Sequence, residues 1–333
     1  MTRPVKSGAT GGVKTRIATT VIGGYLGAGK TTLVNHLLRT AGGQRIAVLV
    51  NDFGALPIDR DLIVGGDDGG DTLEISGGCI CCSYGSDLME ALLALPQRRP
   101  GIDRVLIETS GVALPGMVAS AVGLLDAYAL DGIVVLADAE TVRTQAADAY
   151  IGDTIARQLG AADLVILNRC DLVTGPVRDE TVRWAEGQAP NGRVVPAERA
   201  QVPAELLLGP RGGDVAVAGV LRTPGGVAAS VLYDSLSFTP DHPVDVDGLA
   251  RDLTAPEAGV LRAKGCLRDK EGRLAVLQIV GRRVERTEAP AGALPGTLVV
   301  IGLRGRLDRA RIERAIGEAG TIRAAGAWRG VEN

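Results

Sequence analysis

The sequence predicts an α/β protein, with one domain built on a mostly parallel sheet and a smaller α+β domain after it. Short apolar, β-branched runs alternate with segments of helical periodicity, which is typical of a parallel sheet covered on both faces. At residues 209–230 the composition becomes rich in Gly and Pro, and strand-like runs predominate afterwards. We therefore expect a flexible tail at 1–15, the first domain at 16–208, a linker at 209–230 and the second domain at 231–333.

The apolar runs of the first domain give its expected strands. The runs at 104–108, 132–138 and 163–168 each end in a polar residue. These side chains should meet at the carboxyl edge of the sheet, where parallel sheets bind ligands. Helices are expected at 30–40 and 86–95, the second with Ser86 as its N-cap and Pro96 as its stop signal. The expected strands lie at 16–22, 45–51, 72–76, 104–108, 132–138 and 163–168.

The second domain should contain four strand runs and one late helix. The helix is expected at 308–320, in the segment DRARIERAIGEAG. The strand runs lie at 232–238, 260–269, 274–285 and 297–303.

Composition narrows the classes of function. With 46% apolar residues, 23% charged residues and a net charge of −3, the chain resembles ordinary globular proteins and offers no basic block for nucleic acid. No apolar run is long enough to cross a membrane, and the N-terminus lacks the apolar middle of a signal peptide. Three of the five cysteines share one tetrapeptide, which favours local thiol chemistry in a reducing cytoplasm.

The segment IGGYLGAGKTT at 22–32 contains a phosphate-binding loop, G-x-x-x-x-G-K-[ST], between an expected strand and an expected helix. Its glycines let backbone amides point at phosphate oxygens, and the helix adds the positive end of its dipole. Lys30 is expected to reach the β- and γ-phosphates, and the Thr31 hydroxyl to ligate Mg²⁺. A Gly-rich strand-to-helix turn that contains Gly-Lys-Thr by chance is the alternative.

Asn168-Arg169-Cys170-Asp171 follows the strand at 163–168 and indicates guanine as the base. GTPases commonly carry Asn-Lys-x-Asp here: the carboxylate accepts from two guanine donors, and the residue after Asn lies across the ring. An Arg guanidinium can stack on the ring as well. A plain helix cap at Asp171 is the alternative. The residues expected to contact the nucleotide are Gly24, Gly27, Ala28, Gly29, Lys30, Thr31, Thr32, Gly111, Asn168, Arg169 and Asp171.

Two acidic residues are candidates for the hydrolysis machinery, together with Lys30 and Thr31. Glu108 ends the run RVLIE and is expected to hold the Mg²⁺ shell or its water, while the Gly111 amide senses the γ-phosphate. Asp52 follows the run RIAVLVN in a loop placed like a nucleotide switch, and either a catalytic or a loop role is open for it.

The tetrapeptide at 79–82 supplies three soft donors, Cys79, Cys81 and Cys82. As thiolates they suit Zn²⁺ and other thiophilic metals, and three ligands leave one tetrahedral position open for an exchangeable metal. Redox pairing and plain buried cysteines are the alternatives. His36 and His242, the only histidines, are interpreted as structural and turn residues.

Taken together, these motifs resemble the CobW-type GTPases, a family of P-loop metal chaperones that includes the hydrogenase and urease nickel-insertion GTPases. The resemblance rests on GGYLGAGKTTLVNHLL, VNDFG, GGCICC, IETSG, ILNRCDLV and the later VLRAKGCL and LAVLQIVGRR. It implies GTP hydrolysis with Mg²⁺, coupled to delivery of zinc or cobalt to a client protein through the C-terminal domain. It leaves a homodimer open.

The chain departs from the family pattern at three places. Asp52 and Ala55 stand where the family carries two glutamates, Arg169 replaces Lys, and a His-rich stretch is absent. The prediction is therefore a cytoplasmic GTP-hydrolysing metallochaperone that binds zinc or cobalt. The alternatives are an activator of one metalloenzyme, such as a nitrile hydratase, and a small-molecule kinase that uses the same phosphate loop.

Overall fold

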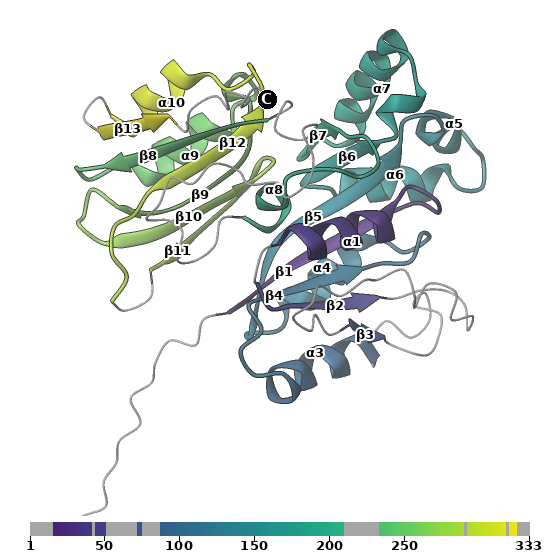
Figure 1. Ribbon diagram of the computed structural model, residues 1–333, viewed down its shortest axis with the longest axis horizontal. Helices are drawn as coiled ribbons and strands as arrows, with labels where there is room; N and C mark the ends of the chain where they lie inside the picture. The colour runs from purple at the N-terminus through teal and green to yellow at the C-terminus, as the bar shows by residue number, and fades with distance from the viewer. Residues whose placement is uncertain are drawn as a thin grey trace, which may run out of the picture.

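The computed structural model describes residues 16–41, 44–50, 72–74, 87–209, 233–289, 292–317 and 320–324. In the first part of the chain, seven parallel strands form one sheet in the order β3-β2-β4-β1-β5-β6-β7, as expected for alternating strands and helices (Figure 1). The strands are β1 (Ile17–Gly24), β2 (Ile46–Val50), β3 (Thr72–Glu74), β4 (Arg104–Glu108), β5 (Tyr128–Asp138), β6 (Leu164–Asn168) and β7 (Arg193–Pro196).

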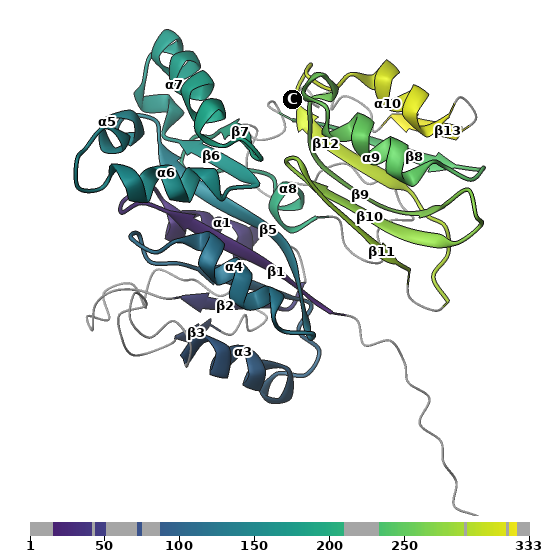
Figure 2. The ribbon, with the colours of Figure 1, turned by 180° about the vertical axis from the view of Figure 1, so that it is seen from behind.

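Helices cover both faces of this sheet. Helices α1 (Lys30–Thr40) and α8 (Ala204–Leu208) pack on one face, and the others pack on the opposite face, where Figure 2 shows α3, α4 and α6 in front of the strands. The helices of that second group are α3 (Asp87–Arg98), α4 (Pro115–Gly123), α5 (Val142–Ala146), α6 (Gly152–Gly160) and α7 (Gly175–Gln188).

The stop signal predicted at Pro96 is wrong, because α3 continues through Pro96 to Arg98. Proline cannot donate a hydrogen bond to the carbonyl four residues earlier, which here belongs to Leu92. The Tyr128 hydroxyl donates to that carbonyl instead, at 2.5 Å. A side chain from β5 thus replaces the missing helical bond, which no local sequence signal could indicate.

The second domain is a six-stranded antiparallel sheet in the order β11-β10-β9-β12-β8-β13. The run predicted at 274–285 is two strands, because Gly281 has a φ of +60° and opens a two-residue hairpin turn. The helix at 246–254 was not predicted. The elements are β8 (Tyr233–Pro240), α9 (Val246–Thr254), β9 (Val260–Arg268), β10 (Leu274–Val280), β11 (Arg283–Glu288), β12 (Leu298–Leu303), α10 (Arg309–Ile316) and β13 (Gly320–Ala324).

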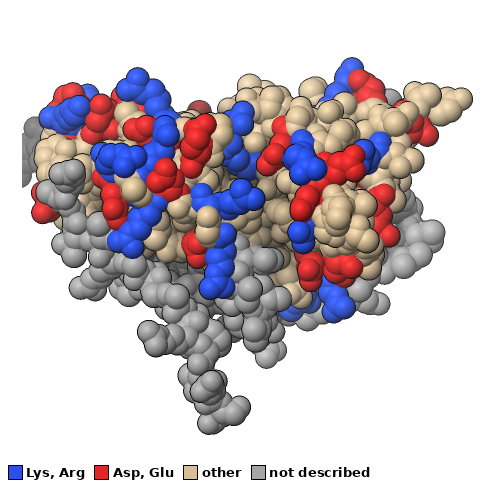
Figure 3. Space-filling model, turned by 90° about the horizontal axis from the view of Figure 1, so that it is seen from above, with Lys and Arg blue, Asp and Glu red and all other residues tan. Residues whose placement is uncertain are grey.

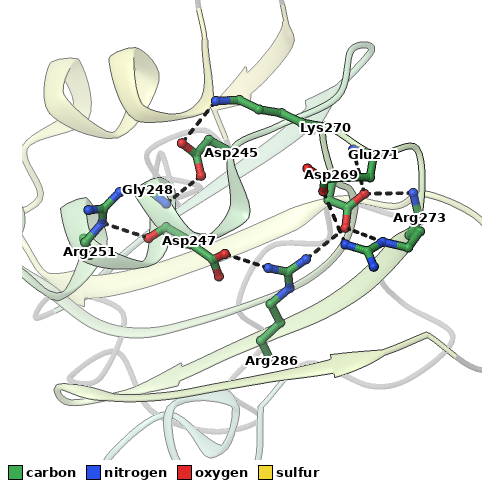
Figure 4. Close-up of polar contacts among 9 residues, drawn as sticks. All are labelled: Asp245, Asp247, Gly248, Arg251, Asp269, Lys270, Glu271, Arg273 and Arg286. Carbon is green, nitrogen blue, oxygen red and sulfur yellow. Dashed lines mark hydrogen bonds and ion pairs between the residues drawn. The ribbon is translucent and has the colours of Figure 1, made fainter.

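A group of charged side chains fixes the start of α9 against the hairpin of β9 and β10 (Figure 4). Asp245 caps α9 by accepting from the Gly248 amide at 2.9 Å. Arg286 on β11 donates to Asp247 at 2.8 Å and to the buried Asp269 at 2.9 Å. These bonds hold α9 on the face of the sheet where the apolar core of the second domain lies.

The two domains share an apolar core. One cluster of buried residues joins Leu33 and Leu37 of α1 to Tyr233, Leu261 and Ile301 of the second domain. Because burial of shared apolar surface stabilises the contact, the second sheet is fixed on the face of the first sheet that carries α1 and α8.

A buried ionic cluster lies at the same contact. Asp131 of β5 accepts hydrogen bonds from Arg104 of β4, from Arg262 of β9 at 2.7 Å and from Gln278 of β10 at 2.5 Å. Arg104 and Arg262 also donate to backbone carbonyls of α8. Burial alone would raise the pKa of Asp131, but the charges of Arg262 and Arg104 lower it to about 2.

The surface seen in Figure 3 carries Lys and Arg interspersed with Asp and Glu over the described residues, without a continuous field of one sign. Within the described ranges, no helix is both long and apolar enough to span a membrane. The predicted tail at 1–15 lies outside the described residues, as does the predicted linker at 209–230 except for Gly209.

Candidate functional site

The predicted phosphate loop joins the end of β1 to the start of α1, as its sequence context requires. Gly24 has a φ of +131°, and a Cβ there would lie 2.3 Å from the Leu136 carbonyl oxygen of β5. Only glycine fits both the conformation and the close approach. The chain therefore turns away from the sheet at its carboxyl edge and leads directly into α1.

Lys30 is the first residue of α1, and its side chain folds back over the loop. Its ammonium donates to the carbonyls of Gly24 at 3.0 Å and Tyr25 at 3.2 Å. Lys30 is 9% exposed, so its positive charge is held inside the loop with little access to water. This places a cation among the backbone groups expected to hold phosphates.

Thr31 and Glu108 meet beside the loop. The Thr31 hydroxyl donates to the Glu108 carboxylate at 2.8 Å, although the two residues are far apart in the chain. Glu108 ends β4, next to β1 in the sheet, and is 5% exposed. Hydroxyl and carboxylate oxygens are hard ligands of the kind that Mg²⁺ prefers.

Gly111 follows Glu108 and lies against the loop. A Cβ at Gly111 would be 2.8 Å from the backbone nitrogen of Leu26 and 2.4 Å from its side chain. The turn after β4 therefore approaches the loop more closely than any other residue type would allow.

Asn168, at the end of β6, connects the loop to the chain that follows β7. Its amide nitrogen donates to the Ala28 carbonyl at 3.0 Å, and its oxygen accepts from the Ala200 amide at 2.7 Å. Gly29 fits against this side chain, because a Cβ at Gly29 would be 2.6 Å from the Asn168 amide nitrogen. Asn168 thus supports the loop from behind.

Arg169 has a φ of +60° and donates to Asp138, the last residue of β5, at 2.7 Å. Asp138 is buried, whereas the Arg169 side chain is 43% exposed, so the carboxylate fixes one end of an accessible guanidinium. Asp171 lies in a 3₁₀ turn at 170–172 and is exposed. Burial raises the pKa of the Cys170 thiol beside it.

The structure brings most of the predicted site together at one edge of the sheet. Thr32 lies exposed on α1, and His36 donates from its Nε2 to the Val202 carbonyl at 2.8 Å, consistent with a structural role. Asp52 and the three cysteines, Cys79, Cys81 and Cys82, lie outside the described residues. Among the residues that are described, no three His, Cys, Asp or Glu side chains gather as a metal site.

Sequence reasoning placed Asp138 at this edge but missed its pairing with Arg169, and it missed the contribution of Ala200. Asp138 ends an apolar strand, so its position at the carboxyl edge could have marked it as a partner for Arg169. Ala200 gives no such signal, because it contributes only its backbone amide, which donates to Asn168. That amide is oriented by a backbone with left-handed φ angles of +51° at Arg199 and +56° at Ala200. The need for that conformation cannot be seen in residues that are not glycine.

Comparison with known proteins agrees with this geometry. Residues 18–195 match the family model described as the CobW/HypB/UreG nucleotide-binding domain. Residues 233–319 match the model of the C-terminal domain of the cobalamin synthesis protein CobW. The two matches correspond to the parallel and antiparallel sheets.

Three relatives are similar in sequence. A zinc chaperone CobW from a Sinorhizobium species is 32% identical over 355 aligned positions, covering 90% of this chain and 96% of that protein. The zinc chaperone YjiA of Escherichia coli is 38% identical, covering 47% of this chain and 50% of that protein. A zinc-regulated GTPase metalloprotein activator of Schizosaccharomyces pombe is 34% identical, covering 47% of this chain and 40% of that protein.

Proposed function

Because the chain belongs to the CobW/HypB/UreG family of nucleotide-binding proteins, we propose that it is a GTP-hydrolysing metallochaperone. It binds a thiophilic divalent metal, zinc or cobalt, and delivers it to a client metalloprotein. The names of the relatives support this: two are zinc chaperones and a third is a GTPase that activates metalloproteins.

The observation that carries the nucleotide part is the meeting of Thr31 and Glu108 at 2.8 Å beside the buried Lys30. These oxygens fit Mg²⁺, since both are hard donors and both belong to the ends of elements that border the phosphate loop. When bound there, Mg²⁺ neutralises charge on the β- and γ-phosphates. Glu108 orders the ion or its water, and Lys30 stabilises the charge that develops on the transferred phosphoryl group.

The base side of the site is formed by Asn168, Arg169 and Asp171. The proposal assigns the Asp171 carboxylate to the two guanine donors, and the Arg169 guanidinium, fixed by Asp138, to the face of the ring. Asn168 fixes the phosphate loop relative to the base side of the site, since its side chain bonds to Ala28 of the loop and to Ala200.

The proposed metal binding is supported by the ligand preference of cysteine thiolates and by the similarity of the chain to zinc chaperones. Three thiolates from Cys79, Cys81 and Cys82 favour zinc and leave one coordination position open, as a metal that must be released requires. Asp52 is proposed to belong to the loop that responds to the nucleotide. The client is proposed to bind through the second domain.

Hydrolysis of GTP and of ATP by the purified protein with Mg²⁺ tests the proposal. We expect GTP turnover without any phosphate acceptor, and a loss of about a hundredfold or more in Lys30→Ala, because a buried cation at the phosphates is removed. Lys270→Ala is the matched control, since Lys270 is 64% exposed and pairs with Asp245 in the second domain. Equal turnover of Lys30→Ala and the control would contradict the proposal, and turnover only with an acceptor would indicate a kinase.

A further inference from the structure

The turn that follows Glu108 is held from the side opposite the phosphate loop by one buried side chain, Gln158 of α6. Its amide nitrogen donates to the Gly111 carbonyl at 3.0 Å and to the Ala113 carbonyl at 2.8 Å. Gln158 is 1% exposed and lies on the buried face of α6 between Ile155 and Leu159. A polar side chain buried in an apolar face is costly unless it is hydrogen-bonded, and here both bonds go to this turn.

Other contacts fix the same turn. The Thr109 amide donates to the Ile22 carbonyl of β1 at 2.9 Å, and the Ala113 amide donates to the Ser110 carbonyl at 3.1 Å. Gly111 itself lies against Leu26 of the phosphate loop. The turn is thus clamped between the loop and α6.

Buried donors of this turn have no acceptor in the described part of the chain. The Ser110 hydroxyl is fully buried in a residue that is 3% exposed, and it makes no hydrogen bond there. Gly111 is a buried residue, and its amide donates to no backbone carbonyl among the described residues. Unsatisfied buried donors cost free energy, so their presence beside a phosphate loop indicates that an anionic ligand accepts from them.

The clamp limits how the turn at 109–113 can rotate. In a planar trans peptide the C=O of Gly111 and the N–H of Val112 point in opposite directions. Gln158 holds the Gly111 and Ala113 carbonyls toward α6. The Val112 amide is therefore directed away from α6, and the peptide unit that joins Gly111 to Val112 cannot rotate freely. Loss of Gln158 would leave the turn free to rotate without removing any group that contacts a nucleotide.

We propose that Gln158 is a positioning residue that holds the turn at 109–113 so that its buried donors bind the terminal phosphate of a nucleoside triphosphate. This rests on the proposed function, because it requires that the site binds GTP. A diphosphate lacks the terminal phosphate, so Gln158 should affect the triphosphate state alone. The residue therefore sets how well the protein distinguishes GTP from GDP.

The test compares the affinities of each variant for GDP and for a non-hydrolysable GTP analogue, by calorimetry with Mg²⁺ below the melting temperature of that variant. Gln158→Met keeps the volume and removes both donors, so the affinity for the analogue relative to GDP should fall about tenfold. Gln158→Asn keeps the amide but cannot reach both carbonyls, and a smaller fall is expected. Gln145→Met on α5 is the matched control and should leave the ratio unchanged, since the side-chain bonds to the turn in the described structure come from Gln158 of α6 and Gln145 lies on another helix.

Ser110→Ala provides an independent arm. Since the hydroxyl has no protein partner in the described structure, its removal should not lower the melting temperature of the nucleotide-free protein, yet it should weaken analogue binding. Equal losses for GDP and the analogue in Gln158→Met would show a purely structural role and overturn the inference. If Gln158→Met does not fold, an unchanged ratio in Gln158→Asn would overturn it. Wild-type protein that binds neither nucleotide would remove the proposed function itself.

Discussion

Replacing Asp131 by Asn should strongly destabilise the protein, because among the described residues this carboxylate pairs with both buried guanidinium groups of the cluster that joins the two sheets. The side chains of Asp131 and Arg262 are each 1% exposed, and that of Arg104 is 6% exposed. Asp131→Asn would leave two buried guanidinium groups without their counter-charge. Removing one partner of a buried ion pair typically costs about 3–5 kcal/mol, a large part of the total stability of a domain.

The lowered pKa of Asp131 indicates how much the ionised carboxylate stabilises the fold and how that contribution depends on pH. Its value of about 2 lies below the ordinary 3.8, and a difference of that size corresponds to about 2 kcal/mol. A carboxyl whose pKa is lowered by folding contributes stability that is present above pH 4 and is lost as the pH falls toward 2. The stability difference between wild type and Asp131→Asn should therefore be constant near neutral pH and shrink below about pH 4.

Urea unfolding followed by circular dichroism measures both effects. Asp103→Asn is the matched control, because Asp103 pairs with Arg45 at 3.0 Å on the surface, where the side chains are 46% and 65% exposed. Exposed ion pairs contribute little, so the control should unfold close to wild type. If Asp131→Asn unfolded at the same urea concentration as Asp103→Asn, the buried cluster would not be what holds the two sheets together.

Two further substitutions test the nucleotide site. Gly29→Ala should weaken GTP and GDP binding by at least about tenfold, since its φ of +103° is strained for Ala and the new Cβ would displace Asn168. Gly27→Ala, with a φ of +76° but nothing within 4 Å of the new Cβ, should cost less, and equal losses would argue against the contact with Asn168. Asp138→Asn should release Arg169, whose side chain is 43% exposed, and lower the affinity for GTP and GDP about 2–5-fold. Fluorescent-nucleotide titrations measure both, and unchanged binding in Asp138→Asn would exclude a role for Arg169 at the base.

The carboxyl edge of the parallel sheet could be predicted because it depends on local patterns. Glu108 and Asn168 each end an apolar run, and parallel strands bring such ends to one edge. The phosphate loop is equally local, since its glycines, Lys30 and Thr31 all lie within the single segment 24–31. The fold class followed from the same alternation of strands and helices.

Contacts between distant segments could not be predicted. Arg262 reaches Asp131 across 131 residues, and Gln158 reaches Gly111 across 47, with no periodicity to indicate either pairing. The helix that continues through Pro96 is a further case, because the Tyr128 hydroxyl supplies the replacement bond from another element. In each case tertiary packing satisfies a group whose partner lies far away in the chain. The domain boundaries, the thiolate site and Asp52 stay predictions.

If GTP hydrolysis drives metal delivery as proposed, the nucleotide site and the thiolate site must act on each other, and linked binding measurements test this. Zinc affinity is titrated against a chelator dye under reducing conditions, with the protein loaded with GDP or with a non-hydrolysable GTP analogue. We expect zinc to bind about 5–150-fold more tightly to protein loaded with the GTP analogue than to protein loaded with GDP. Zinc should in turn raise the affinity for the analogue by the same factor, because coupling between two sites is reciprocal. Replacing Cys79, Cys81 and Cys82 by Ser should abolish both effects and preserve nucleotide binding. Identical zinc affinity in the two nucleotide states would contradict the proposed coupling of GTP hydrolysis to metal delivery.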